Sequence, residues 1–165
     1  MITFRHAEPG DLSTVADLMI EVERFYGTEE FPPRQDWERD IKAALFDPFP
    51  AARVLLAMEA AEALGLASYN FLWPAAGVSR SLFLKELYVR DPHRRRGIGI
   101  DLMSRLHTIA IDSGCSRVEW QTDALNIEAQ MFYKKLGVAP MADKITYRSN
   151  GADLGRISQL RQHAE

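Results

Sequence analysis

Residues 82–99 constrain the fold more than any other part of the chain. Residues 82–89 are apolar on both faces, apart from the adjacent Lys85 and Glu86, which is typical of a central strand in a sheet. A basic, glycine-containing turn follows over residues 94–99, and apolar residues at helical spacing come after it. A buried strand that leads through a short turn into an amphipathic helix predicts a sheet covered by helices.

Strand and helix patterns are interleaved along the rest of the chain. Apolar alternation predicts further strands at residues 2–5, 53–58, 64–73, 117–122 and 144–148. Helical spacing predicts helices from about Asp11, over 34–46, after Gly97, over 127–136 and in the tail from Ala152. We therefore expect an α/β (α+β) fold with a mixed sheet, formed by residues 1–165 as a single domain.

Composition narrows the classes of function. The 165 residues include 20 Lys and Arg and 23 Asp and Glu, so the net charge of −3 does not favour general binding of nucleic acid. The single cysteine, Cys115, excludes an internal disulfide and a cysteine-built zinc site, and the four histidines show no metal-ligand spacing. We expect no metal.

The uncharged stretches do not resemble membrane or targeting segments. The longest of them, residues 63–79, contains Gly65, Asn70, Pro74 and Gly77, which argues against a membrane span. The first residues carry charges and no long apolar run follows them, so no signal peptide is predicted. The expected location is the cytoplasm.

The turn at residues 94–99 has the chemistry of a phosphate site. Gly97 and Gly99 allow the backbone to approach a ligand closely, and the following helix presents its N-terminal N–H groups. Arg94, Arg95 and Arg96 add positive charge. The sequence predicts a site for phosphate or pyrophosphate. The alternative is a solvated turn whose glycines serve only packing.

Glu86 is the second feature that calls for a chemical explanation. A carboxylate in a strand that is otherwise apolar needs a polar partner. Its neighbour Lys85 should point to the opposite face of the strand. The partner is then an amine or a water, or else an arginine elsewhere in an ordinary ion pair, and the sequence leaves both open.

Two motifs in this order resemble the GNAT superfamily of N-acetyltransferases. Arg94-x-x-Gly97-x-Gly99 matches the acetyl-CoA pyrophosphate motif Gln/Arg-x-x-Gly-x-Gly/Ala, and residues 126–137 match Asn-x-x-Ala-x-x-Phe-Tyr-x-x-x-Gly. The chain looks most like the spermidine/spermine and thialysine branch. The resemblance implies a GNAT-type mixed central sheet of six to seven strands, flanked by helices.

The resemblance also implies a co-substrate and site residues. Acetyl-CoA would be bound, without a metal, by one set of residues: Leu87, Tyr88, Val89, Arg94, Arg95, Arg96, Gly97, Ile98, Gly99, Ile100 and Asn126. Asn126 would contact the pantetheine arm, and Tyr133, close to two helical turns further on, would lie near the thioester sulfur. The alternative for Tyr133 is a core residue of an amphipathic helix.

These features predict an N-acetyltransferase in which a primary amine attacks the thioester directly, with Glu86 as proton acceptor and Tyr133 as acid. Between Asp17 and Asp40 lie eight acidic and three basic residues, which favours a small cationic acceptor such as a diamine, a polyamine or a lysine-like amine. The alternative is that these acidic residues only form a solvated helix face. Two further functions fit the same motifs: a non-catalytic CoA-binding regulatory module, and a protein or amino-acid N-acetyltransferase. Related enzymes are often homodimers joined at their C-terminal strands, and we expect the same here.

Overall fold

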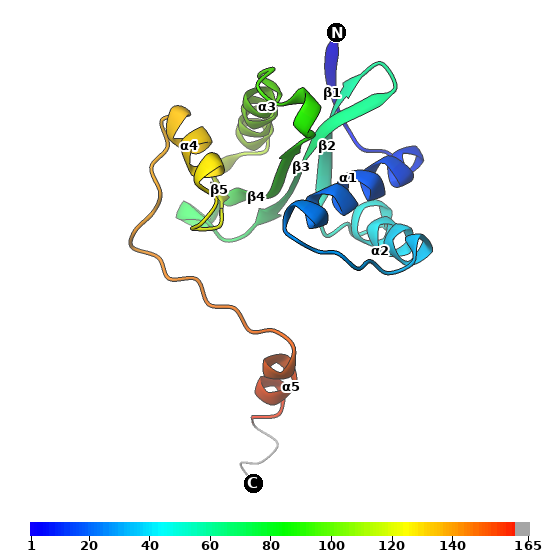
Figure 1. Cartoon of the computed structure of the whole chain (residues 1–165). Helices are drawn as coiled ribbons and strands as arrows, with labels where there is room; N and C mark the ends of the chain where they lie inside the picture. Colours follow the sequence, from blue (N-terminus) through cyan, green and yellow to red (C-terminus); the bar gives the residue numbers. More distant parts are fainter. Residues whose placement is uncertain (161–165) are drawn as a thin grey trace. The chain divides into compact units, whose positions relative to one another are not determined.

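The computed structural model describes residues 1–160, and it divides into two compact units. The first unit is Met1–Gln121 and the second begins at Thr122 (Figure 1). Each unit is described by itself below.

The first unit is built on one sheet of five strands. These are β1 (Ile2–His6), β2 (Arg53–Glu59), β3 (Glu62–Leu72), β4 (Arg80–Val89) and β5 (Cys115–Trp120). They lie side by side in chain order, with β1 to β4 antiparallel and β5 parallel to β4. A parallel neighbour requires a crossover, and a helix supplies it between β4 and β5.

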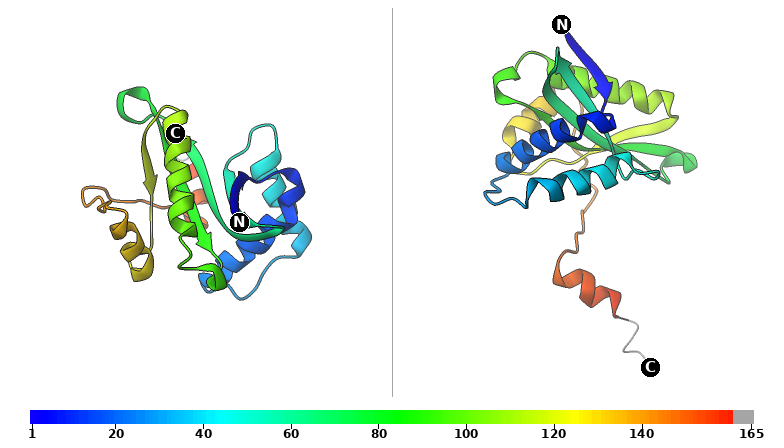
Figure 2. Two further views of the ribbon diagram at one scale, coloured as in Figure 1. Left: turned by 90° about the horizontal axis from the view of Figure 1, so that it is seen from above. Right: turned by 90° about the vertical axis from the view of Figure 1, so that its right-hand side faces the viewer.

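Helices cover both faces of this sheet. The helices α1 (Leu12–Phe25) and α2 (Arg34–Phe46) lie on one face, and α3 (Ile98–Asp112) lies on the other (Figures 1 and 2). We call these the α1/α2 face and the α3 face. On the α1/α2 face Val15 and Leu18 pack against Leu56 and Leu66, which are all buried. Each such side chain contributes roughly 1.5–3 kcal/mol on burial.

On the α3 face the helix supplies its own apolar stripe. Ile98, Leu102, Met103, Leu106 and Ala110 are buried there. Their spacing of three and four residues is the one expected after Gly97. The short 3-10 helices η1 (Pro9–Asp11), η2 (Ala76–Val78) and η3 (Asp91–His93) connect the longer elements.

Gly65 allows β3 and β4 to approach each other closely. It pairs with Val89, and a Cβ atom added to it would lie 2.4 Å from the carbonyl oxygen of Tyr88. Real Cβ atoms do not come this near to backbone, so a larger residue would push the end of β4 away. The position needs a glycine for close approach.

The second unit contains α4 (Ile127–Lys135) and α5 (Ala152–Ser158). The strand expected at residues 144–148 does not form, and Ile145 and Tyr147 are 79% and 89% exposed. An isolated strand leaves its backbone groups unpaired, so alternation in the sequence does not suffice without a neighbouring strand. Within residues 1–160 the sheet therefore has five strands, not six to seven.

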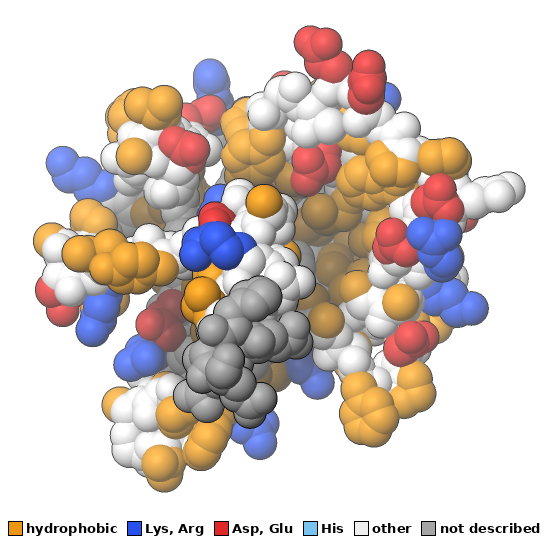
Figure 3. All heavy atoms as spheres, turned by 90° about the horizontal axis from the view of Figure 1, so that it is seen from below, with side chains coloured by type: hydrophobic (Ala, Val, Ile, Leu, Met, Phe, Trp, Pro, Cys, Tyr) orange, Lys and Arg blue, Asp and Glu red, His pale blue; other side chains and the backbone are white. Residues whose placement is uncertain are grey.

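The surface mixes charged and apolar side chains. Figure 3 shows Lys and Arg, Asp and Glu, and apolar side chains intermingled over one face. Within the described residues, no helix is both long and apolar enough to cross a membrane, and no cluster of His, Cys, Asp or Glu is placed to hold a metal ion.

Candidate functional site

A β-bulge in β4 determines the position of Glu86. Ser68 of β3 pairs with Glu86, but the next residue, Tyr69, pairs with Leu84, so Lys85 is an extra residue without a partner in β3. Such a bulge bends a strand and redirects its side chains. Tyr88 pairs with Leu66 and packs against the core on the α1/α2 face. Glu86, two residues before Tyr88, therefore lies on the same face.

Glu86 is half-buried and has a tyrosine as its partner. The hydroxyl of Tyr26, just after α1, donates to Glu86 Oε1 at 3.3 Å. Burial raises the pKa of the Glu86 carboxyl, although the Tyr26 hydrogen bond and the charge of Lys85 oppose the rise. Among the described residues no arginine is recorded as an ion-pair partner of Glu86. A carboxylate with a raised pKa, hydrogen-bonded only to neutral donors, the Tyr26 hydroxyl and the Leu87 backbone among the described residues, is suited to accept a proton.

Most of the acidic residues between Asp17 and Asp40 are neutralised by arginines. Arg34 pairs with Asp17 and Glu38, and Arg39 pairs with Asp36 and Asp40. Glu21 pairs with Arg90 at 2.7 Å. These five carboxylates belong to structural ion pairs, which agrees with the alternative that this acidic stretch is a solvated helix face.

Three acids remain near the end of α1. Glu23 accepts a hydrogen bond from the Thr28 hydroxyl at 2.9 Å, and its charge helps to raise the pKa of Glu86. Glu29 and Glu30 are exposed, and within residues 1–160 neither has a recorded ion pair. We call Glu23, Glu29 and Glu30 the acidic rim.

Asn70 was not among the predicted site residues, although the structure leaves one of its atoms without a hydrogen bond. Asn70 Oδ1 is buried without a hydrogen-bond partner, as is Nε1 of Trp37 on α2. Asn70 follows Ser68 by two residues in β3, so both lie on the α1/α2 face with Glu86. An asparagine within an otherwise apolar strand was the available signal. Buried polar atoms without partners call for an explanation.

The pairing of β4 with β5 ends before the bulge. The last paired residues are Leu84 and Trp120, so Glu86–Val89 pairs with β3 on one side only, within the part of the chain described. Backbone groups of Leu87, Tyr88 and Val89 that point to this side are not used by a neighbouring strand. An open strand edge of this kind can hydrogen-bond the amides of an extended ligand or the oxygen of a carbonyl group.

The turn before α3 combines strained backbone with free donors. Gly97 has φ of +83° and precedes α3 as its N-cap, and Arg95 has φ of +62°. The first N–H groups of α3, from Ile98 to Ile100, have no acceptor within the helix. An anion placed there would satisfy them. The positive φ of Gly97 favours glycine there. An added Cβ would meet no atom within 4 Å, so the space beside the backbone is open.

The three arginines of this turn have different environments. Arg94 donates to the Val89 carbonyl at 3.0 Å and pairs with Asp91 at 2.9 Å. Arg96 pairs with Glu59 at 2.9 Å. Arg95 is exposed, and no acidic residue within residues 1–160 forms an ion pair with it. The side chain of Arg95, rather than all three, is the one available for a phosphate.

The other two predicted site residues lie in the second unit. Asn126 caps α4, because its side-chain oxygen accepts from the Ala129 N–H at 3.0 Å. This leaves its NH₂ group as a donor for a ligand. Tyr133 is half-buried and its ring makes an edge contact with Phe132, with centroids 5.2 Å apart. The roles of Asn126 and Tyr133 remain predictions.

Comparisons with known proteins agree with the sequence motifs. Residues 16–138 match the model of the acetyltransferase (GNAT) family. The chain is 33% identical over 93 residues to D-amino-acid N-acetyltransferase HPA3 of Saccharomyces cerevisiae, covering 56% of each protein. It is 28% identical over 80 residues to thialysine N-epsilon-acetyltransferase of Sus scrofa, covering 48% of this chain and 46% of the relative. The matched region thus spans about half the length of these relatives.

A solved structure matches almost the whole chain. It is an integron cassette protein from the mobile metagenome of V. cholerae, with 29% identity and a TM-score of 0.89, covering 96% of this chain and 98% of that one. The family model covers well over half of the sequence, and the fold and the two motifs agree with it. The chain belongs to the GNAT family of acetyltransferases.

Proposed function

We propose that the protein transfers the acetyl group of acetyl-CoA to a primary amine within a ternary complex. The observation that carries this proposal is the bulge in β4. One bulged strand presents a half-buried carboxylate, Glu86, to the α1/α2 face and an open backbone edge, Glu86–Val89, to a ligand. The strand then leads to the glycine turn before α3. A carboxylate suits an amine that must lose a proton, and the open strand edge and the glycine turn suit an acyl donor such as acetyl-CoA.

The first unit contains groups suited to the parts of acetyl-CoA. Acetyl-CoA supplies an acetyl group activated as a thioester. Arg95 and the first N–H groups of α3 would hold its pyrophosphate. The open edge of β4 would bind the pantetheine amides, and backbone N–H groups near Leu87 and Val89 would stabilise the negative charge that develops on the carbonyl oxygen. The role that the family resemblance implies for Asn126 is a contact of its NH₂ group with the pantetheine arm.

Glu86 would take the proton that the amine must lose. A lysine-like amine has a pKa near ~10.4, so only about one molecule in a few thousand is neutral at pH 7. Glu86 would accept this proton, directly or through a water. The neutral amine nitrogen then forms a bond to the carbonyl carbon, the bond from carbon to sulfur breaks, and Tyr133 gives a proton to the departing thiolate. The second proton leaves the nitrogen as the amide forms and, carried by water, restores the Tyr133 hydroxyl.

The surroundings of Glu86 favour a cationic acceptor. The acidic rim and Glu86 together place four carboxylates near the end of α1, and the ion pairs found among residues 1–160 involve none of the four. Such a group attracts cations. The unpaired oxygen of Asn70 would accept a hydrogen bond from an ammonium group of the acceptor. Relatives named for thialysine and for L-ornithine N5 acetylation suggest amines of this class.

The test is acetyl transfer to a panel of amines, with release of free CoA thiol as the readout. Release with diamines, polyamines or lysine-like amines supports the proposal. Binding of acetyl-CoA without release for any amine would instead favour the non-catalytic CoA-binding module. The homodimer and the cytoplasmic location remain predictions.

A further inference from the structure

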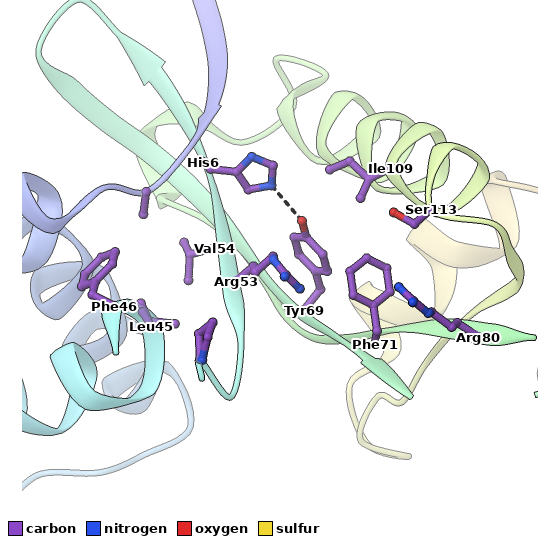
Figure 4. Close-up of a pocket in the computed structure, with 12 residues that line it drawn as sticks. His6, Leu45, Phe46, Arg53, Val54, Tyr69, Phe71, Arg80, Ile109 and Ser113 are labelled. Carbon is purple, nitrogen blue, oxygen red and sulfur yellow. Dashed lines mark hydrogen bonds between the residues drawn. The ribbon is translucent and has the colours of Figure 1, made fainter. Parts of the chain in front are cut away.

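A cavity lies at the end of the sheet opposite the glycine turn. Its volume is about 520 Å³, which is within the range of small-molecule sites. Figure 4 shows residues from β1, β2, β3, α2 and α3 around it. The lining residues include His6, Arg53, Tyr69, Phe71, Arg80 and Ser113.

The charge of the cavity is of one sign. Arg53 and Arg80 line it, and none of the lining residues is acidic. The Arg53 guanidinium lies over the Phe71 ring, 5.2 Å from its centroid. Neither arginine has a recorded carboxylate partner among residues 1–160, although most arginines of the α1/α2 side do. Two uncompensated cations in a chain of net charge −3 select for an anion.

Neutral polar groups lie beside these two cations. His6 Nε2 and the Tyr69 hydroxyl are 2.7 Å apart, and Figure 4 shows them pointing toward each other. Burial and the charge of Arg53 lower the pKa of His6, so the imidazole is neutral at pH 7. Tyr69 is only 1% exposed, although it lines the cavity. The His6–Tyr69 pair and Ser113 add hydrogen-bonding groups that fix orientation without charge.

The remaining walls are apolar. Ile109 on α3, Leu45 and Phe46 at the end of α2, and the Phe71 ring line the cavity. An inorganic ion would leave this apolar surface in contact with water and most of the volume empty. An anion with an apolar body would use both parts of the lining.

The cavity is separate from the proposed transfer site. Arg80 begins the ten-residue strand β4, and Val89 ends it next to the glycine turn. At 3.3 Å per residue the two ends lie about 30 Å apart. Phe71 follows Tyr69 by two residues in β3, and both are on the face opposite Ser68 and Glu86.

We propose that this cavity is a second binding site, for a small organic carboxylate with an apolar body. Arg53 and Arg80 bind the carboxylate, the His6–Tyr69 pair and Ser113 orient it, and Phe71 and Ile109 pack against the apolar part. The site lies outside the acetyl-transfer machinery, and its occupancy does not depend on acetyl-CoA.

The experiment uses benzoate as the probe and benzamide, its neutral counterpart of similar shape, as the comparison. Titration calorimetry is carried out on the full chain saturated with CoA, so that the glycine turn is not available to the anion. Benzoate should bind in the millimolar range or more tightly, and benzamide at least tenfold more weakly. Arg53→Gln and Arg80→Gln should each weaken benzoate binding by about 10–100-fold, the range for hydrogen bonds to charged groups.

The matched control is Arg105→Gln. Arg105 lies over the Phe4 ring at 4.3 Å, so this variant loses the same charge and the same kind of ring contact without lining the cavity. It should leave benzoate binding unchanged. In protein labelled with ¹³C at the isoleucine δ1 methyl groups, benzoate should shift the Ile109 resonance and not that of Ile98 at the other end of α3.

Four results would overturn the second site. Three are equal binding of benzamide and benzoate, equal weakening by Arg105→Gln and the cavity variants, and a resonance change at Ile98 in place of Ile109. The fourth is absence of benzoate binding below about 10 mM. Because the readouts are binding and chemical shift, none of them depends on acetyl transfer.

Discussion

The hydroxyl of Tyr26 donates a hydrogen bond of 3.3 Å to the Glu86 carboxylate, and this contact joins the end of α1 to the bulge of β4. The bond stabilises the charged form of Glu86, while burial disfavours it, and burial has the larger effect on the pKa. Glu86 is therefore a carboxylate whose charge costs stability in the folded chain. Such a cost is expected where a charged group serves chemistry rather than folding.

Glu86→Gln should lower kcat and raise stability at the same time. If Glu86 is the proton acceptor, kcat should fall by about 100-fold, and the acidic limb of the pH profile should disappear. The raised pKa means that the folded chain binds this proton more tightly than the unfolded chain, so the carboxyl's contribution to stability falls as pH rises from its ordinary 4.5 through the folded value. The variant should therefore melt at a higher temperature than the natural chain at pH 7, but not below pH 4.5.

The control for this prediction is Glu29→Gln, which removes an exposed carboxylate and should leave the melting temperature unchanged. A Glu86→Gln variant with full kcat would remove Glu86 from the mechanism. Lower stability at pH 7 would show instead that the carboxylate has a stabilising structural role.

Tyr133→Phe should lower kcat by about 10–100-fold, because the thiolate would lose its proton donor. The variant keeps the ring that contacts Phe132, so the fold and the affinity for CoA should change little. Steady-state kinetics with a saturating amine, together with CoA titration, separates the two effects. An unchanged kcat would make Tyr133 a core residue of α4.

Asn70→Ala should raise the KM for a cationic amine by about tenfold, if the unpaired Oδ1 accepts a hydrogen bond from the acceptor. Removing an unsatisfied buried atom relieves a cost, so the variant should lose little stability. Ser81→Ala removes another buried polar side chain, at the start of β4 where Ser81 pairs with Leu72, and should leave KM unchanged. A large loss of stability with an unchanged KM would assign Asn70 to packing.

Acetyl-CoA should raise the melting temperature in a dose-dependent way, by mass action, and pantetheine fragments without phosphate should do so far less. Gly97→Val should abolish this shift by hindering the backbone approach. Gly114→Val is the matched control, because Gly114 also has a positive φ, +68°, and open space at its Cβ position. It should cost similar stability and keep the shift. Loss of the shift in both variants would contradict a site at the turn.

The sequence predicted most of the fold because its patterns are local. The apolar stripe after Gly97, the alternation in residues 53–58 and the helical spacing from residue 127 each depend on neighbours in the chain, and the structure has each of them. The prediction of a strand at residues 144–148 was wrong, because a strand needs a neighbouring strand to pair with and local alternation does not supply one. The register shift at Lys85 was missed for a related reason, since a bulge is visible only in the pairing of two strands.

The candidate site likewise has some features that local sequence predicts and others that only the folded structure shows. Glu86 and the glycine turn stand out in the sequence because a carboxylate in an apolar strand and a Gly-x-Gly before a helix are local signals. That Arg94 and Arg96 pair with Asp91 and Glu59, which leaves Arg95 available, follows from contacts alone. The neutralisation of five of the eight acids by Arg34, Arg39 and Arg90 likewise needed the folded arrangement.

The central claim is tested most directly by kcat/KM for acetyl transfer across a panel of amines at two salt concentrations, about 50 and 200 mM, measured as release of CoA thiol. Diamines, polyamines and lysine-like amines should be acetylated in preference to neutral amines and to amino acids without a second amine. Their kcat/KM should fall with salt, because exposed attraction to the acidic rim is screened over about 8–10 Å. A preference for neutral or anionic acceptors would contradict the cationic acceptor, and no thiol release with any amine would contradict acetyl transfer itself.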